Sequence, residues 1–296
     1  MSGPFVKVCG VTREEDLDLA IELGADFVGL NFHPSSPRYL APERAAVLAA
    51  RARGRVAVVG VFVDRRRAEV EDIAETVGLD LLQFHGAEGP DDLAPFGDRA
   101  VKVLRLAPGE RPAPEGLAAT LASYPAAWGF LVDVRHPTLA GGTGESWSWG
   151  AIAGTDSGGR PLLVAGGIRP DNAAEALAAS GAAGIDVCSG VEAAPGVKDR
   201  DLLAGLFRAV GAVRAGLAAR TESDAGTLRS YAAGSARPAT AGAAPAPGAD
   251  VRPRPEAGYD GAHAGDARSP NPRTPARGAT APTDPPEDPD GEDRAP

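Results

Sequence analysis

Two residues with reactive side chains, Cys9 and Asp133, end apolar runs of the sequence. Cys9 ends FVKVC, and Asp133 follows three apolar residues in FLVDV. A thiol can act as a nucleophile or a base, and a carboxyl group as an acid or a base. Each also has a structural interpretation, because a single cysteine often packs in a core and an aspartate often caps a loop or helix. A carboxylate beside a buried strand is costly without a partner or a purpose, so Asp133 is the more informative of the two.

Three glycine-containing segments follow later apolar runs. They are GGTG with Gly142, VAGG with Gly166 and Gly167, and DVCSG with Ser189 and Gly190. Glycine lets backbone N–H groups approach a phosphate closely, although a single glycine can also serve only a tight turn. A phosphorylated ligand is predicted if the last two segments lie side by side.

Arg38 and His85 are further candidates. Arg38 lies in the stiff segment SSPRYL, where its guanidinium could hold a carboxylate in a bidentate fork or could simply face solvent. His85, in QFHG, fits either the wall of a ligand site or a core histidine. The other histidines are His33, His136 and His263, and no group of His, Cys and Asp has the spacing of metal ligands, so no metal is expected. Neither a P-loop nor a Ser–His–Asp signature occurs.

The elements that position these residues repeat along the first 220 residues. Apolar, β-rich runs end near residues 9, 31, 63, 84, 105, 133, 165 and 188, and an amphipathic stretch long enough for one helix separates each pair. The first helix should begin with a capping box formed by Thr12 and Glu15. Strands that are apolar on both faces and alternate with helices indicate a parallel sheet covered by helices.

Eight such units predict an α/β fold, a compact (β/α)8 TIM barrel over residues 1–220. A doubly wound open sheet is the alternative, but it usually has a glycine-rich fingerprint after the first strand, where this chain has CGVTREED. In a barrel, ligands meet the ends of the strands, and phosphates often bind the loops after strands seven and eight. Asp186 and Cys188 are two residues apart, so both should point inward.

Residues 221–296 differ from the rest in composition. They hold 13 of the 27 prolines and only four large apolar residues, so this segment is predicted to be a disordered tail. The formal net charge of −10 argues against nucleic-acid binding, and no apolar run is long enough to cross a membrane. The first residues lack a secretory pattern, and two cysteines make no disulfide framework, so a cytoplasmic protein is expected.

The ordered set of motifs resembles the phosphoribosylanthranilate isomerase family of tryptophan biosynthesis. The matching segments, which span residues 5 to about 199, are KVCGVTREEDLDLAIELGADFVGLNF, SPRYL, QFHG, LVD, GGTG, VAGGIRPDN and DVCSGVEAAPGVKD. The resemblance implies a cofactor-independent isomerase with a TIM barrel. It implies an Amadori rearrangement that turns N-(5-phosphoribosyl)anthranilate, a small phosphorylated substrate, into the 1-deoxyribulose 5-phosphate.

The resemblance also implies roles for individual residues. Asp133 matches the acid that protonates the ribose ring oxygen, and Cys9 matches the base that removes the proton from sugar carbon 2. Arg38 matches the residue that meets the anthranilate carboxylate, and Asp186 lies where it can reach the sugar hydroxyls. The chain departs from the family at Cys188, where serine is common. A monomer or a homodimer is expected.

Two other functions remain open from the sequence. A related barrel isomerase also accepts the phosphoribosyl aminoimidazole substrate of histidine synthesis, but such enzymes normally have aspartate at the position of Cys9. A catalytically silent barrel that acts as a scaffold through its tail is the other alternative. Such a scaffold would not need Cys9, Asp133 and Arg38 together.

Overall fold

The chain folds into a closed barrel of eight parallel strands in sequential order, as the spacing of the apolar runs predicts. The structure, a computed structural model, describes residues 3–107, 110–134 and 149–234. The barrel strands are β1 Phe5–Cys9, β2 Phe27–Asn31, β3 Ala57–Phe62, β4 Leu81–Phe84, β5 Ala100–Leu106, β6 Gly129–Val134, β7 Leu162–Ala165 and β8 Gly184–Val187. The barrel closes where β8 pairs with β1, with Val8 opposite Val187.

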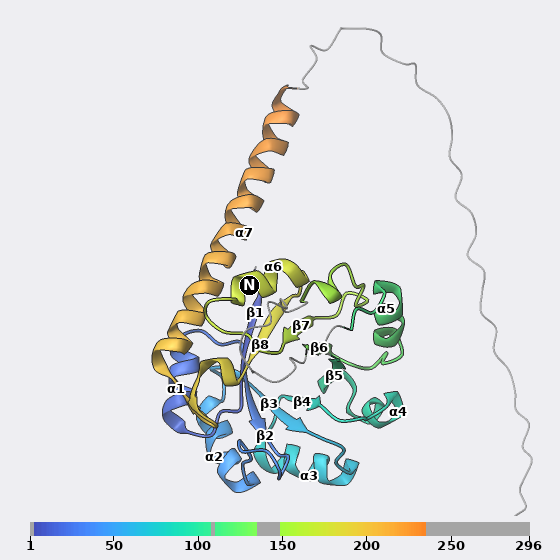
Figure 1. Cartoon of the computed structure of the whole chain (residues 1–296), viewed down its shortest axis with the longest axis vertical. Helices are drawn as coiled ribbons and strands as arrows, with labels where there is room; N and C mark the ends of the chain where they lie inside the picture. The colour runs from blue at the N-terminus through green and yellow to red at the C-terminus, as the bar shows by residue number, and fades with distance from the viewer. Residues whose placement is uncertain (1–2, 108–109, 135–148, 235–296) are drawn as a thin grey trace, which may run out of the picture. The chain divides into compact units, whose positions relative to one another are not determined.

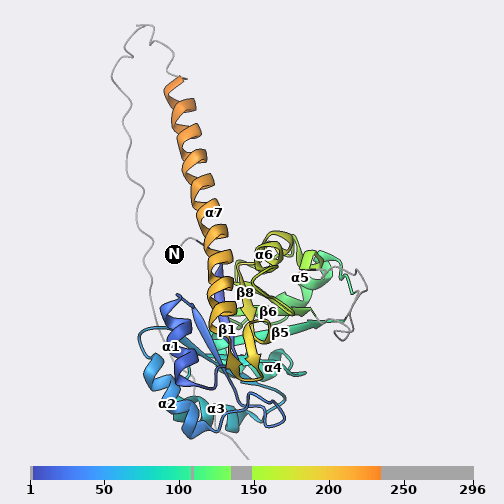
Figure 2. The same ribbon diagram turned by 60° about the vertical axis from the view of Figure 1, so that its left-hand side comes forward.

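Helices surround the barrel on its outer side (Figures 1 and 2). They are α1 Glu14–Glu22, α2 Pro42–Ala52, α3 Arg67–Val77, α4 Pro90–Leu93, α5 Pro114–Ala122, α6 Ala173–Ser180 and α7 Arg200–Gly234, with the 3-10 turns η1 Ala94–Arg99, η2 Trp149–Ile152 and η3 Ser189–Val191. A small antiparallel pair, β9 Glu192–Ala194 and β10 Val197–Lys198, follows η3. Between β6 and β7 the described residues form η2, and 135–148, on which the helix expected there also depends, lie outside the description.

The alternation of side chains along each strand divides the core into two parts. One cluster fills the space between strands and helices and includes Val6, Val8 and Phe62. The other lies inside the barrel and includes Phe27 and Leu131. Because side chains alternate between the two faces of a strand, Cys9 at the end of β1 points to the barrel axis, opposite to Val6 and Val8.

The predicted capping box at the start of α1 is wrong. The helix begins at Glu14, and its N-cap residue, Arg13, makes no side-chain cap hydrogen bond. The Thr12 hydroxyl donates instead to the carbonyl oxygen of Gly196, in the turn between β9 and β10. A tertiary contact to a segment 184 residues away therefore replaces the local cap that the sequence suggested.

The last helix, α7, passes the boundary that the composition predicted after residue 220, since it continues to Gly234. Among the side chains of this helix whose burial is described, which end at Leu217, Leu203, Leu206 and Val210 are almost fully covered. Arg214 ties the helix to the barrel through the carbonyl of Pro4 and the carboxylate of Asp26. The remainder of the predicted tail, 235–296, lies outside the described residues. No helix in the part of the chain that the structure describes is long and apolar enough to cross a membrane.

A chain truncated after Arg220 is expected to keep its activity and its melting temperature, because all these contacts precede the cut. Its Tm should differ from that of the full chain by less than about 2 °C, which for a domain of this size corresponds to under 1 kcal/mol. A matched truncation after Ala209 removes Val210 and Arg214 and should lower the Tm clearly. Thermal unfolding followed by circular dichroism measures both, and a marked loss of stability in the chain that ends at Arg220 would show that residues 221–296 pack on the barrel.

Candidate active site

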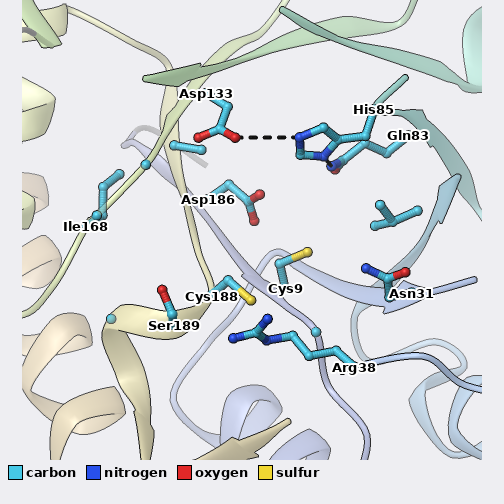
Figure 3. A pocket seen from close by; sticks show the side chains of 16 residues that line it. Cys9, Asn31, Arg38, Gln83, His85, Asp133, Ile168, Asp186, Cys188 and Ser189 are labelled. Atoms are coloured by element: carbon cyan, nitrogen blue, oxygen red, sulfur yellow. Dashed lines mark hydrogen bonds and ion pairs between the residues drawn. The ribbon is translucent and has the colours of Figure 1, made fainter. Parts of the chain in front are cut away.

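The carboxyl-terminal ends of the strands surround a cavity of about 350 Å³. Nine of the ten predicted site residues line it: Cys9, Arg38, His85, Asp133, Gly166, Gly167, Asp186, Ser189 and Gly190. The tenth, Gly142, lies in the segment 135–148, outside the described residues. Figure 3 shows Asp133 and His85 on one side of the cavity, Cys188 and Arg38 on the opposite side, and Cys9 and Asp186 between them.

Cys9 is surrounded by groups that favour its thiolate. It is 8% exposed, and Cys188, which lies one residue beyond β8, also points into the cavity, as the alternation predicts. A hydrogen bond from the Cys188 thiol lowers the pKa of Cys9; burial opposes this, and the ammonium of Lys7 lowers the pKa further. The net result is a pKa of Cys9 well below its ordinary value, so the sulfur is suited to act as a base near neutral pH.

Lys7 lies two residues before Cys9 on the same face of β1 and forms a buried ion pair with Asp186. The Nζ–Oδ1 distance is 3.0 Å, and the two side chains are 4% and 8% exposed. The pKa of Asp186 is raised to about 7, mainly by burial. The negative charges of Cys9 and Asp133 raise it further, and the ammonium of Lys7 lowers it but offsets only part of the shift. Burial alone would lower the pKa of Lys7, but Asp186 and Cys9 outweigh it and raise that pKa, so Lys7 stays charged. The ammonium of Lys7 thus stabilises the charged forms of both Asp186 and Cys9.

Asp133, the last but one residue of β6, faces the imidazole of His85 across the cavity. The distance from His85 Nε2 to Asp133 Oδ2 is 3.5 Å (Figure 3). The other ring nitrogen, Nδ1, lies 3.4 Å from the amide nitrogen of Gln83. With Gln83 as the donor to Nδ1, the ring proton resides on Nε2 and points to Asp133. His85, which the sequence left open between two interpretations, therefore lies in the wall of the cavity.

The guanidinium of Arg38 is held by a carboxylate of the chain itself. Its Nε donates to Glu192 Oε1 at 2.9 Å, and its Nη2 donates to Glu192 Oε2 at 2.5 Å. The pair raises the pKa of Arg38, whose Nη1 has no hydrogen-bond partner among the described residues. The bidentate fork expected for a ligand carboxylate is thus occupied on one edge, and only the Nη1–Nη2 edge remains for a ligand.

The loops after β7 and β8 approach each other closely, as the glycine segments suggested. Gly166 and Gly167 have φ values of +96° and +56°, which residues with a side chain rarely adopt. A side chain at Gly190 would collide with the carbonyl oxygen of Ile168. Within the described residues, the backbone N–H groups of Gly167, Ser189 and Gly190 have no acceptor, so they are available to an anion.

The sequence did not point to several polar residues of this region, among them Lys7, Gln83, Glu192 and Lys198. A signal existed for the first two, because a lysine or glutamine inside an apolar strand run must find a partner. For Glu192 and Lys198 there was no local signal. No group of at least three His, Cys, Asp or Glu side chains in the described ranges is arranged to hold a metal ion.

Comparison with known proteins identifies one family. The family model described as N-(5'phosphoribosyl)anthranilate (PRA) isomerase matches residues 6–209. The N-(5'-phosphoribosyl)anthranilate isomerase of Bordetella bronchiseptica is 42% identical over 211 residues, which cover 70% of this chain and 96% of that protein.

Solved structures show the same similarity. The phosphoribosyl anthranilate isomerase of Thermotoga maritima is 31% identical, with a TM-score of 0.62 over 71% of this chain and 99% of that one. A phosphoribosyl anthranilate isomerase in complex with reduced 1-(o-carboxyphenylamino)-1-deoxyribulose 5-phosphate is 28% identical, with a TM-score of 0.59 and the same coverage. The extent of these matches shows that the chain belongs to the N-(5'-phosphoribosyl)anthranilate isomerase family.

Proposed function

We propose that the chain converts N-(5'-phosphoribosyl)anthranilate to 1-(2-carboxyphenylamino)-1-deoxyribulose 5-phosphate, with Cys9 as the general base and Asp133 as the general acid. The observation that carries the proposal is the shared cavity in which a thiol with a lowered pKa and a carboxyl group face one ligand volume. The reaction needs no redox change, since one hydrogen moves from sugar carbon 2 to carbon 1 while the ring opens.

In the first step Asp133, in its protonated carboxylic-acid form, gives a proton to the ring oxygen and becomes a carboxylate, and the bond between that oxygen and sugar carbon 1 breaks. The lone pair of the anthranilate nitrogen forms a double bond to carbon 1, which makes a protonated Schiff base. His85, whose Nε2 lies 3.5 Å from the Asp133 carboxyl group, holds this group toward the cavity. A positioned acid of this kind contributes about 100- to 10,000-fold to a rate.

In the second step the Cys9 thiolate removes the proton from carbon 2, and the electrons of that C–H bond form an enolamine. These electrons form the double bond between carbon 1 and carbon 2, and the electrons of the double bond between carbon 1 and the nitrogen move to that nitrogen, which becomes neutral. In the tautomerisation that follows, the hydroxyl group at carbon 2 loses its proton and carbon 1 gains one, which gives the ketone at carbon 2. Lys7 and Cys188 support the thiolate before this step, because both lower the pKa of Cys9. Asp186 lies beside Cys9 in the same cavity and is proposed to bind the sugar hydroxyls.

The phosphate of the substrate is proposed to bind where the loops after β7 and β8 meet. The backbone N–H groups of Gly167, Ser189 and Gly190 supply donors that need no side chain. Gly142 is proposed to add to the substrate site. Arg38 is proposed to bind the anthranilate carboxylate at the other end of the cavity, which orients the sugar between Cys9 and Asp133.

Substituting Arg38→Lys is expected to raise the KM for N-(5'-phosphoribosyl)anthranilate at least about tenfold, a loss of roughly 1.4 kcal/mol of binding. A lysine ammonium cannot present one edge to Glu192 and a second, parallel edge to a ligand. Steady-state kinetics with the purified variant measures this. An unchanged KM would mean that the arginine does not touch the substrate.

A direct assay tests the proposed function. The purified chain is given N-(5'-phosphoribosyl)anthranilate and, separately, the phosphoribosyl aminoimidazole substrate of histidine synthesis. Turnover of the first alone supports the proposal, turnover of both supports the dual-substrate alternative, and turnover of neither supports the scaffold alternative. The aspartate that normally marks dual-substrate enzymes is replaced here by Cys9, which favours the single substrate.

We further propose that the protein is cytoplasmic and works as a monomer or a homodimer. A dimeric phosphoribosylanthranilate isomerase is known from Thermotoga maritima. Light scattering coupled to size-exclusion chromatography distinguishes the two states, and cell fractionation tests the location.

A further inference from the structure

A buried ionic cluster lies against the cavity, and none of its groups gives or takes a proton in the proposed reaction. Glu192 on β9 and Lys198 on β10 pair across the small antiparallel ribbon, with 2.9 Å between Lys198 Nζ and Glu192 Oε1. Their side chains are 4% and 0% exposed. Together with Arg38 they form what we call the arginine brace.

The brace is costly to bury if it serves stability alone. Removing two charges from water carries a large penalty, and apolar residues of similar volume often stabilise a protein as well or better. The charged groups of the brace meet at the carboxylate of Glu192. Glu192 Oε1 accepts from Arg38 Nε at 2.9 Å, from Lys198 Nζ at 2.9 Å and from the Gly196 amide at 3.3 Å.

Lys198 extends the brace to the strand ends that hold the thiols. Its Nζ donates to the carbonyl oxygen of Cys9 at 2.6 Å and to that of Cys188 at 3.2 Å. One ammonium therefore joins the end of β1, the residue after β8 and the carboxylate that holds Arg38. A displacement of Glu192 would therefore change the positions of both the Arg38 guanidinium and, through Lys198, the backbone at Cys9.

The path of the Arg38 side chain depends on this arrangement. It crosses Gly10, where an added Cβ would lie 2.5 Å from Arg38 Cδ. Glu192 takes the Nε and Nη2 donors on one edge of the guanidinium, which leaves the Nη1–Nη2 edge for a ligand. Arg38, Glu192 and Lys198 carry charges of +1, −1 and +1, so the cluster has a net charge of +1, matched to one carboxylate.

We propose that Glu192 is a positioning residue, which fixes the guanidinium of Arg38 so that its free edge receives the carboxylate of the substrate. This inference rests on the proposed function, because it assumes an aromatic acid as the group bound there. Lys198 is the anchor that ties Glu192 to the backbone of the site. Ionisation of Glu192 is secure: burial opposes it, but Arg38 and Lys198 outweigh burial and lower the pKa of Glu192.

A double-mutant cycle tests the inference. Glu192→Gln keeps the shape of the side chain and removes its charge, and it is expected to raise the KM for N-(5'-phosphoribosyl)anthranilate about tenfold with kcat within about threefold. In an Arg38→Met background the same substitution should change KM less than about twofold, because the group to be positioned is absent. An equal KM ratio in both backgrounds would overturn the inference.

A second substrate separates positioning from a general structural effect. N-(5-phosphoribosyl)aniline lacks the carboxylate, so Glu192→Gln should leave its kcat/KM within about twofold of the wild-type value. An equal loss with both substrates would overturn the inference. If Glu192→Gln does not fold, Glu192→Asp is the second variant, because it keeps the charge on a shorter side chain. It should raise KM only for the substrate that has the carboxylate. Equal effects on both substrates would contradict the inference.

A matched control uses an exposed ion pair of the same length. Arg44 Nη1 lies 2.9 Å from Glu14 Oε1 on the surface, and neither residue lines the cavity. Glu14→Gln should leave the KM of both substrates unchanged. The failure of this inference is distinguishable from that of the proposed function, since a wild-type chain that turns over neither substrate would contradict the function itself.

Discussion

Replacing Cys9 with alanine is expected to lower kcat by about 100- to 10,000-fold, while far-UV circular dichroism and the melting temperature stay close to those of the wild type. The physical reason is that the C–H bond at sugar carbon 2 needs a base, and the sulfur of Cys9 is the group in the cavity whose pKa the surroundings lower. Alanine removes the base and leaves a side chain of smaller volume at a position that is 8% exposed. Turnover within about threefold of the wild type would contradict the assignment.

Alkylation with iodoacetamide tests the charge state of Cys9 apart from turnover. Only a thiolate reacts at an appreciable rate, so a lowered pKa means that inactivation continues as the pH falls below the range of ordinary thiols. The sign follows from the shift: the pKa of Cys9 is lowered, so its reactive form persists to lower pH. The Cys9→Ala variant is the control, because it keeps only the thiol of Cys188. In the wild type the pKa of Cys188 is raised by its hydrogen bond to Cys9, by burial and by the charge of Cys9.

Inactivation that follows the pH dependence of a free thiol would show that Lys7 and Cys188 do not activate the sulfur. Replacing Lys7 would test the same point less cleanly. Its ammonium is 3.0 Å from Asp186, and removal leaves a buried carboxyl group without its partner. For that reason alkylation of the intact chain is the sharper measurement.

The barrel and most of its cavity could be predicted from the sequence because their signals are local. Apolar runs of strand length recur at regular steps, and in a barrel a residue at the end of a strand must lie at the site. Alternation along β8 placed Asp186 and Cys188 on one face, and both line the cavity. The glycines near residues 166 and 190 marked a close approach of two loops, which the structure confirms.

What could not be predicted depends on contacts between distant segments. Thr12 looks like a helix cap in the sequence, but Gly196 provides a better acceptor once β9 and β10 are in place. Arg38 was expected to offer its fork to a ligand, and its partner Glu192 is 154 residues away. The position of Lys198 follows from the pairing of β9 with β10, which no local pattern indicates. The partners of these buried charged groups are therefore set by the tertiary fold and not by the neighbouring sequence.

Replacing Asp133 with asparagine is expected to lower kcat by about 100- to 10,000-fold, because an amide of the same shape cannot give up a proton to the ring oxygen. The amide oxygen of asparagine can still face His85 Nε2, which lies 3.5 Å from Asp133 Oδ2, so the fold should be unaffected. A matched control is Asp80→Asn, which sits just before β4 at the opposite end of the barrel and accepts from the Val58 amide at 2.7 Å. That variant should keep wild-type turnover.

Isotope effects distinguish the two catalytic roles more sharply than rates do. With deuterium at sugar carbon 2, a variant in which proton removal limits the rate shows a full primary isotope effect, whereas slow ring opening hides it. Asp133→Asn should therefore show an isotope effect close to one, and Cys9→Ala, if its residual turnover is measurable, a larger effect than the wild type. A full isotope effect in Asp133→Asn would mean that Asp133 does not act in ring opening. In that case the proton for the ring oxygen would have to come from another group in the cavity, and His85, 3.5 Å from Asp133 and hydrogen-bonded to Gln83, would be the next residue to replace.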